Sequence, residues 1–254
     1  MDFYCPFRQI AVPLHHYLSE TSPIIMKYII LDFDGTIGDS QALIVRTFQD
    51  TMRKMGKEVK SAEECAGTIG MRLSEAFALL YNSPIEEGEK CAEVYRDIFE
   101  ENKDSLGMNP FPHVIETIKQ LHKQGFVLAV ASSRGRESLL GFIHQMKLED
   151  SISSVVAQED VVNVKPQPDM VFKALMEIAG REVSKEDCHI LPDDLKAMLS
   201  ETLVVGDMTF DVDMAHNAGA KACAVTYGNG TGEQLASAEW IIDDFAELLE
   251  IVQD

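Results

Sequence analysis

Basic residues are scarce in this chain. Among its 254 residues, 22 Lys and Arg stand against 42 Asp and Glu, and the formal net charge at pH 7 is −20. So negative a surface repels nucleic acid and anionic membranes, and neither is an expected partner. It also repels phosphorylated molecules. Any phosphate site must therefore supply its own positive charge from Lys, Arg, a metal ion or a helix N-terminus.

Cysteines and long apolar runs are also sparse. The five cysteines are scattered and show no C-x-x-C spacing, which argues against a disulfide framework and a structural zinc site. No run approaches the roughly 18 apolar residues of a membrane span. Pro13, His15 and His16 interrupt the N-terminal segment, so no signal region is predicted. We therefore expect a soluble cytoplasmic protein, and the sequence leaves its oligomeric state open.

The apolar residues that are present follow an alternating β-α pattern. They make up 46% of the composition, which is ample for one large domain or a core with a smaller module. After residues 28–31, strands are predicted at 126–131, 153–157, 202–206, 222–226 and 240–242. Helices are predicted at 113–124, 136–146, 169–180, 209–218 and 244–252. This alternation predicts an α/β fold, a Rossmann-like parallel sheet with helices on both faces.

Residues 41–107 interrupt the alternation. They contain helical patterns at 41–55, 73–82 and 87–103 and no convincing strand. We expect a helical cap at 41–107, inserted into a core made of 27–40 and 108–254, with hinges at Gly38 and at 107–112. Residues 1–26 are interpreted as an extension, with disorder as one possibility.

One connection within the core is unusually long. Residues 181–201 are interpreted as a surface insertion with no assigned role, in which Pro192 could start a short helix.

The segment Asp32-Phe33-Asp34-Gly35-Thr36 follows four bulky apolar residues that predict a strand buried on both faces. Open α/β sheets place ligands at such carboxyl ends. Asp32 could attack phosphorus, and Asp34 could protonate the leaving oxygen and then deprotonate water. The alternative is an Asx-turn that ends the strand, which fits about as well when the segment is taken alone.

Two further candidate sites follow later strands. Ser132 and Ser133 end the strand at 126–131 and could hold phosphate oxygens, although one of them could simply cap the next helix. Lys165 is followed by Pro166 and Pro168, which stiffen its loop, so its ammonium could neutralise a phosphoryl group and nearby carboxylates.

A second pair of aspartates follows the strand at 202–206. Asp207 is a candidate Mg²⁺ ligand together with Asp32 and the carbonyl of Asp34. Asp211 lies one helical turn further and could support the metal site or Lys165. Both could instead belong to the start of a helix, where acidic groups favour the dipole. Four such sites after strands of one predicted sheet are hard to explain by separate structural roles.

These segments together resemble the haloacid dehalogenase-like hydrolase superfamily. D-F-D-G-T at 32–36, Ser132, Lys165 and G-D-M-T-F-D at 206–211 match its four motifs in order, over roughly residues 27–252. The resemblance implies Mg²⁺ dependence and an aspartyl-phosphate intermediate. It assigns Asp32 as nucleophile, Asp34 as general acid and base, and Ser132 and Lys165 as phosphate ligands. Asp32, Asp34 and Asp207 would hold the metal, supported by Asp211.

The insert is similar to the small helical cap of the phosphoglycolate phosphatase and β-phosphoglucomutase-like group. In this resemblance Arg72 could hold a distal carboxylate or hydroxyl, or could be an ordinary solvated arginine. Ile44 stands where the mutases have a histidine, which argues against a mutase. His113 stands where the family more often has glycine.

The preferred function is thus a Mg²⁺-dependent phosphatase of a small phosphorylated metabolite. Phosphoglycolate, a sugar phosphate, a nucleotide monophosphate and pyrophosphate all remain candidate substrates. A phosphosugar mutase and a non-catalytic phosphate-binding module are the alternatives.

Overall fold

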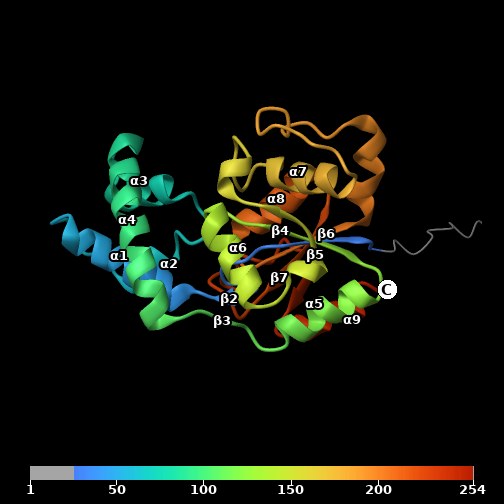
Figure 1. Cartoon of the computed structure of the whole chain (residues 1–254), viewed down its shortest axis with the longest axis horizontal. Helices are drawn as coiled ribbons and strands as arrows, with labels where there is room; N and C mark the ends of the chain where they lie inside the picture. Colours follow the sequence, from blue (N-terminus) through green and yellow to red (C-terminus); the bar gives the residue numbers. More distant parts are fainter. Residues whose placement is uncertain (1–25, 254) are drawn as a thin grey trace, which may run out of the picture.

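A parallel six-stranded sheet forms the centre of the molecule (Figure 1). The computed structural model describes residues 26–253. The strand order is β5-β4-β1-β6-β7-β8, and every neighbouring pair is parallel. The strands are β1 (Tyr28–Leu31), β4 (Val127–Ala131), β5 (Ile152–Val156), β6 (Thr202–Gly206), β7 (Lys221–Val225) and β8 (Trp240–Ile242). The predicted α/β fold with a parallel sheet is confirmed.

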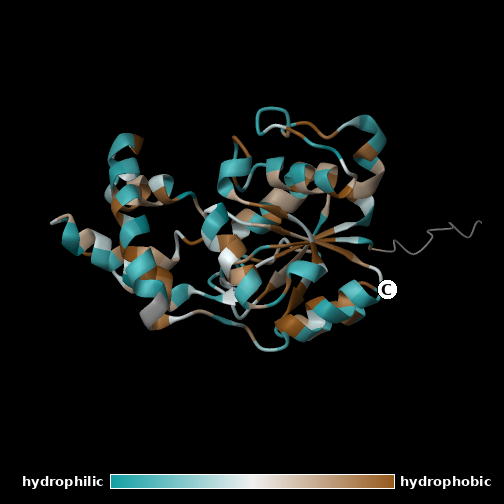
Figure 2. Cartoon of the chain, in the orientation of Figure 1, coloured by the Kyte–Doolittle hydropathy of each residue, from teal (hydrophilic) through white to brown (hydrophobic). Residues whose placement is uncertain are grey.

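Strand β1 lies in the middle of this sheet and is buried on both faces, as its continuous apolar sequence predicts. Ile29 and Leu31 belong to one hydrophobic cluster, and Tyr28 and Ile30 belong to another on the opposite face. Side chains of successive strand residues point to opposite faces, so each face needs its own covering layer. The apolar strands between more polar helices are visible in Figure 2.

Helices cover the two faces of the sheet (Figure 1). On the face of Ile29 lie α5 (Val114–Lys123), α6 (Arg136–Gln145) and the C-terminal pair η4 (Phe245–Glu247) and α9 (Leu248–Ile251). On the face of Ile30 lie α7 (Asp169–Ile178) and α8 (Thr209–Ala218). Short 3₁₀ turns η1 (Glu149–Ser151) and η2 (Gln158–Asp160) flank β5.

The segment between β1 and α5 forms a helical lobe beside the sheet (Figure 1). It contains α1 (Gln41–Lys54), α2 (Ala62–Ala66), α3 (Leu73–Tyr81) and α4 (Ile85–Leu106). The rings of Phe48, Phe77 and Tyr95 contact one another inside it, with centroids 4.7 to 6.1 Å apart. Helix α2 was not predicted; Ser61 and Glu64 form a capping box at its start.

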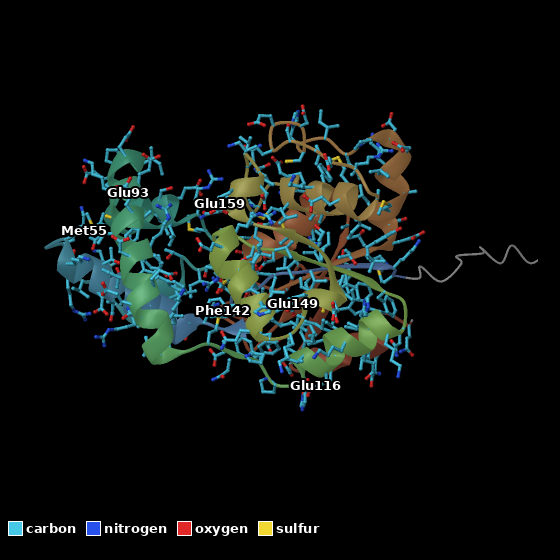
Figure 3. The ribbon with its side chains drawn as sticks, viewed as in Figure 1. Met55, Glu93, Glu116, Phe142, Glu149 and Glu159 are labelled. Atoms are coloured by element: carbon cyan, nitrogen blue, oxygen red, sulfur yellow. The ribbon has the colours of Figure 1, made fainter. Side chains whose placement is uncertain are left out.

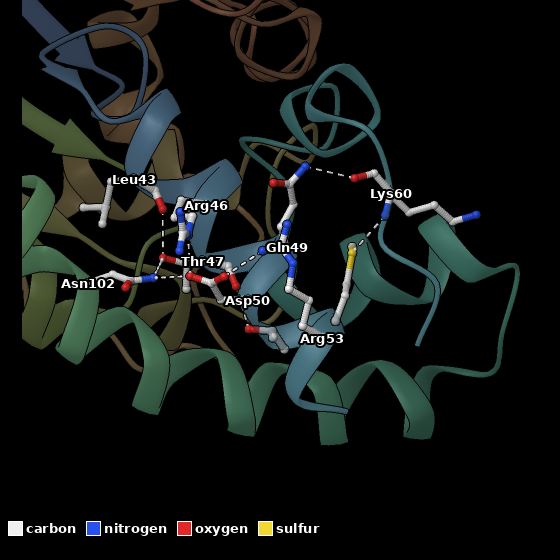
Figure 4. A network of polar contacts seen from close by, with 10 residues as sticks. Leu43, Arg46, Thr47, Gln49, Asp50, Arg53, Lys60 and Asn102 are labelled. Atoms are coloured by element: carbon white, nitrogen blue, oxygen red, sulfur yellow. Dashed lines mark hydrogen bonds and ion pairs between the residues drawn. The ribbon is translucent and has the colours of Figure 1, made fainter. Parts of the chain in front are cut away.

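Polar contacts also join α1 to α4 (Figure 4). Asp50 accepts hydrogen bonds from Arg46 at 2.6 Å and from Arg53 at 2.7 Å. Asn102 on α4 donates to the hydroxyl of Thr47 at 3.2 Å. The contacts of Asp50 with the two arginines lie within α1, whereas the hydrogen bond from Asn102 to the buried Thr47 joins α4 to α1.

The two connections between lobe and sheet pair with each other. β2 (Gly38–Asp39) and β3 (Asn109–Pro110) form a two-stranded antiparallel ribbon, with Gly38 opposite Pro110. The sequence placed hinges at these two segments but did not predict that they pair. Both connections therefore leave the sheet side by side (Figure 1).

The long connection 181–201 ends in a 3₁₀ helix, η3 (Asp193–Glu201), which begins directly after Pro192 as expected. Cys188, Leu191 and Leu195 are buried in the cluster that α7 and α8 form. The segment is therefore partly a core element, not only a surface insertion.

Two further predictions concern the chain ends and membranes. Of the extension predicted at 1–26, only Met26 lies within the described residues, and it is buried. Across residues 26–253, no helix is both long enough and apolar enough to cross a bilayer.

Candidate active site

The candidate site residues follow the carboxyl ends of neighbouring strands. Asp32 comes directly after β1, Ser132 after β4 and Asp207 after β6, and these three strands are adjacent in the sheet. The chain runs from β1 to β4 and β5 on one side of β1, and then crosses to β6 on its other side. Such a reversal of strand order opens a crevice at the carboxyl edge of a parallel sheet.

Lys165 lies between two carboxylates at this edge. Its ammonium donates to Oδ1 of Asp32 and, at 2.6 Å, to Oδ1 of Asp211. All three side chains are at most 5% exposed. Burial alone would lower the pKa of Lys165, but the two carboxylates outweigh it and the pKa lies above its usual value. The ammonium is therefore held charged and fixed in position.

Asp207 is surrounded by hydrogen-bond donors. Its Oδ2 accepts from the main-chain N–H of Asn229 at 2.6 Å and from the Asn229 amide at 2.8 Å. Its Oδ1 accepts from the Thr36 hydroxyl at 3.3 Å. Gly35 has φ +94°, and a Cβ there would lie 2.1 Å from Oδ2 of Asp207. The D-G-T sequence after β1 therefore lets the β1 turn approach the β6 carboxylate closely.

The carboxylates of Asp32, Asp207 and Asp211 form one buried cluster, with oxygens within 4.8 Å of one another. Burial raises the pKa of Asp32 well above its usual value, against the opposing charge of Lys165. Burial and the Asp211 carboxylate raise the pKa of Asp207 to about 7. One ammonium is insufficient for three buried carboxylates, and hard oxygen ligands suit a divalent cation such as Mg²⁺. The residues present therefore fit a metal site.

The carboxylate of Asp34 is paired with Arg134 and is not part of the cluster of Asp32, Asp207 and Asp211. Both of its oxygens accept hydrogen bonds from Arg134, through Nε at 3.0 Å and through Nη2. Burial alone would lower the pKa of Arg134, but the charge of Asp34 outweighs it and the pKa is raised. The sequence analysis did not single out Arg134, although it directly follows Ser132 and Ser133 in the chain. A metal contact from Asp34 would have to use its main-chain carbonyl, as the sequence predicts.

A cavity of about 840 Å³ opens above these residues, between the sheet edge and the helical lobe. Asp32, Asp34, Ser132 and Ser133 line it from the core side. The Ser133 hydroxyl is buried and has no hydrogen-bond partner within residues 26–253. Figure 3 shows Phe142 and Glu159, also in the cavity wall, on the side of the core that faces the lobe.

Side chains of the lobe form the opposite wall. Ile44 and Phe48 of α1, and Tyr95, Arg96 and Phe99 of α4, are among them. Arg72 is not; its guanidinium donates instead to the carbonyl oxygen of Val162 in the core, at 3.3 Å. The predicted substrate contact of Arg72 thus has no support from the cavity wall.

Comparisons with known proteins agree with this arrangement. A family model for haloacid dehalogenase-like hydrolases matches residues 29–225. Pyrophosphatase PpaX of Halalkalibacterium halodurans is 30% identical over 232 residues, covering 88% of this chain and 95% of that protein. IndB of Dickeya dadantii, named as a phosphatase, is 31% identical over 228 residues, covering 87% and 91%.

Solved structures are similar over the same extent. A haloacid dehalogenase-like hydrolase from Bacteroides fragilis superposes with a TM-score of 0.74 at 26% identity, covering 88% of this chain and 99% of that one. A hydrolase from Pseudomonas syringae gives a TM-score of 0.74 at 21% identity, covering 90% and 98%, and shows the fold alone.

A parallel sheet with carboxylates and a lysine at its carboxyl edge defines an α/β protein with a charged site at that edge. The chain belongs to the haloacid dehalogenase-like hydrolase family. The curated relatives that it matches in that family are named as phosphatases.

Proposed function

We propose that the chain is a Mg²⁺-dependent phosphatase that acts on a small phosphorylated metabolite through an aspartyl phosphate on Asp32. The observation that supports this most directly is the cluster of Asp32, Lys165, Asp207 and Asp211 beneath a cavity. Bound Mg²⁺ would supply positive charge to the phosphoryl oxygens and to the crowded carboxylates.

Each residue has a distinct part in this proposal. Asp32 attacks phosphorus with a carboxylate oxygen, and Lys165 holds that carboxylate in place and offsets charge on the phosphoryl group. The hydroxyls of Ser132 and Ser133 donate hydrogen bonds to the phosphoryl oxygens, which would give the unpaired Ser133 hydroxyl a partner. Asp34 protonates the leaving oxygen and then removes a proton from the hydrolytic water. Asp207 holds the metal with Asp32 and the carbonyl of Asp34.

The helical lobe, residues 41–107, is proposed as the cap that covers the substrate. Its helices α1 and α4 supply the wall opposite Asp32, so they would contact the part of the substrate that leaves. Ile44 lies in this wall and is buried. An isoleucine there cannot transfer a proton, which supports a phosphatase over a phosphosugar mutase.

Four kinds of phosphorylated metabolite are proposed as candidate substrates. Phosphoglycolate, a sugar phosphate, a nucleotide monophosphate and pyrophosphate each fit a cavity of about 840 Å³. The pyrophosphatase relative at 30% identity supports including pyrophosphate.

Phosphate release is the decisive measurement. Purified protein with Mg²⁺ is screened over phosphorylated metabolites, and Asp32→Asn is compared with the unchanged chain. We expect turnover of at least one substrate and its loss in Asp32→Asn. Near-normal activity of Asp32→Asn would remove Asp32 as nucleophile, and turnover of no phosphoester would favour a binding module. Conversion of a sugar 1-phosphate to the 6-phosphate without free phosphate would favour the mutase.

A further inference from the structure

Arg134 is the buried cation of the cavity wall that the proposed chemistry does not yet use. It lies in the turn between β4 and α6, lines the cavity, and its side chain is 6% exposed. Besides the two hydrogen bonds to Asp34, its Nη1 donates to the Ser138 hydroxyl at 3.0 Å. Both partners are on the core, so the guanidinium is held from the sheet side.

Three aromatic rings lie close to the guanidinium. Its centre lies 5.7 Å from the ring centroid of Phe33 and 5.1 Å from that of Phe142, both on the core. Phe99, on α4 of the lobe, lies 5.0 Å away. A guanidinium is weakly hydrated and stacks well on such rings, so it can remain charged where water is excluded. Arg134 is thus fixed where core and lobe meet.

Some N–H groups of the Arg134 guanidinium are available for a further hydrogen bond. Of its five N–H groups, three make the hydrogen bonds to Asp34 and Ser138. The other two, one on each Nη, have no partner among residues 26–253. Two N–H groups in one plane match two oxygens of a phosphate or a carboxylate. Arg134 can therefore hold Asp34 and bind an anion at the same time.

The position of Arg134 indicates which part of a substrate would be the anion that it binds. Asp34 is the group proposed to protonate the leaving oxygen, so its hydrogen-bond partner lies on the leaving-group side of phosphorus. The cavity wall also carries Glu137 and Glu159, which repel anions. Arg96 lines the cavity too, but it is exposed to solvent, and its charge is screened.

We propose that Arg134 selects substrates whose leaving group is itself an anion. The class comprises pyrophosphate, whose leaving group is phosphate, and phosphorylated carboxylic acids such as phosphoglycolate. A neutral polyol phosphate would leave the two N–H groups unpaired. This inference rests on the proposed function and narrows its substrate class.

The test compares two substrates in one set of variants. Pyrophosphate and glycerol 2-phosphate differ in the charge of the leaving group. We expect the unchanged chain to prefer pyrophosphate in kcat/KM, and Arg134→Gln to reduce that preference by about tenfold or more, mainly through KM. Arg136→Gln is the matched control, because Arg136 lies two residues after Arg134, pairs with Asp160 and does not line the cavity. It should keep the preference.

A binding measurement covers the case in which Arg134→Gln folds poorly. Arg134→Lys keeps the charge but not the two-pronged geometry. Methylenediphosphonate, a non-hydrolysable analogue of pyrophosphate, should inhibit glycerol 2-phosphate hydrolysis about tenfold less well in this variant. Equal loss on both substrates, an unchanged preference, or unchanged inhibition would overturn the role of Arg134. If the unchanged chain hydrolyses none of the substrates, the proposed function itself would be overturned instead.

Discussion

Asn229 donates two hydrogen bonds to one oxygen of Asp207, one from its main chain and one from its side chain. The carbonyl oxygen of the same side-chain amide accepts a hydrogen bond from Gln41, the first residue of α1, at 2.9 Å. A side chain in the loop after β7 thus joins the proposed metal ligand to the beginning of the lobe. Because Asn229 occupies one oxygen of Asp207, it determines which oxygen faces a bound cation.

Replacing this side chain should weaken metal binding without removing a ligand. Asn229→Ala is expected to lower Mg²⁺ affinity by about tenfold, in the range found when a residue that orients a metal ligand is lost. Titration calorimetry of the free protein measures this directly. Gln234→Ala, in the same loop, is the control, because the Gln234 side chain accepts its hydrogen bonds from Thr231 and makes none to Asp207 in the described residues. Equal Mg²⁺ affinity in Asn229→Ala and the unchanged chain would contradict the orienting role.

Lys165 should stabilise the fold most strongly when no metal is bound. Lys165→Met leaves Asp32 and Asp211 buried without their shared cation, and the free energy of unfolding in EDTA should fall by about 3 kcal/mol or more. Denaturant unfolding measures the loss. Adding Asp211→Asn should recover part of it, because one of the two unpaired carboxylates is then gone. Unfolding that is the same with and without the ammonium would refute this account.

Stabilisation by Mg²⁺ should increase with pH. The raised pKa of Asp207, about 7, means that the folded metal-free protein keeps a proton there that the unfolded chain loses near its ordinary pKa of about 4. Between about pH 4 and pH 7 the folded state binds more protons at this carboxyl than the unfolded state does. The free energy of unfolding of the metal-free protein therefore falls as pH rises through this range. Mg²⁺ competes with that proton.

The increase in melting temperature on adding Mg²⁺ should therefore be larger at about pH 8 than at about pH 5.5. Thermal unfolding at both pH values, with Mg²⁺ and with EDTA, measures it. Asp213→Asn changes an exposed aspartate on α8 and should leave the difference intact. An equal shift at both pH values would show that protonation and metal binding do not compete.

Two helical glycines should respond in opposite ways to alanine. A Cβ at Gly88 of α4 would lie 2.0 Å from the carbonyl oxygen of Ser74 on α3, so Gly88→Ala should destabilise the protein by about 2 kcal/mol. A Cβ at Gly141 of α6 meets nothing within 4 Å, and Gly141→Ala should stabilise by up to about 1 kcal/mol. Thermal unfolding of the two variants compares them. A gain in stability from Gly88→Ala would disprove the close contact of α3 and α4.

The sheet was predictable because each of its strands has a strong local pattern. β1, β6 and β8 begin and end where the sequence placed them, and the other predicted strands differ by about a residue at their ends. The short ribbon of β2 and β3 was not predictable, because two-residue strands have no periodicity and these lie about 70 residues apart in the chain. Helix α2 has five residues, too few for a repeating apolar pattern.

Most of the site residues that the sequence indicated lie in short motifs directly after strands, as Asp32, Ser132 and Asp207 do, and Lys165 lies in the loop that follows β5 and η2. Asn229 and Arg134 were missed because their importance depends on contacts across the sheet, with residues far away in the chain. Arg72 shows the converse: a motif-like position that in three dimensions contacts Val162. Tertiary contacts of single polar side chains leave no periodic signal in the sequence.

Because β2 pairs with β3, the helical lobe is an insertion whose two ends lie next to each other. Asp39 and Asn109 are cross-strand partners, so a two-residue turn between them could replace the entire lobe. The order of strands in the sheet would be the same after such a replacement. Lobes of different length and composition can thus be exchanged at one junction while the aspartates after β1 and β6 stay in register. The part of the cavity wall that the lobe supplies is therefore separable, at the level of the backbone, from the aspartates at the edge of the sheet.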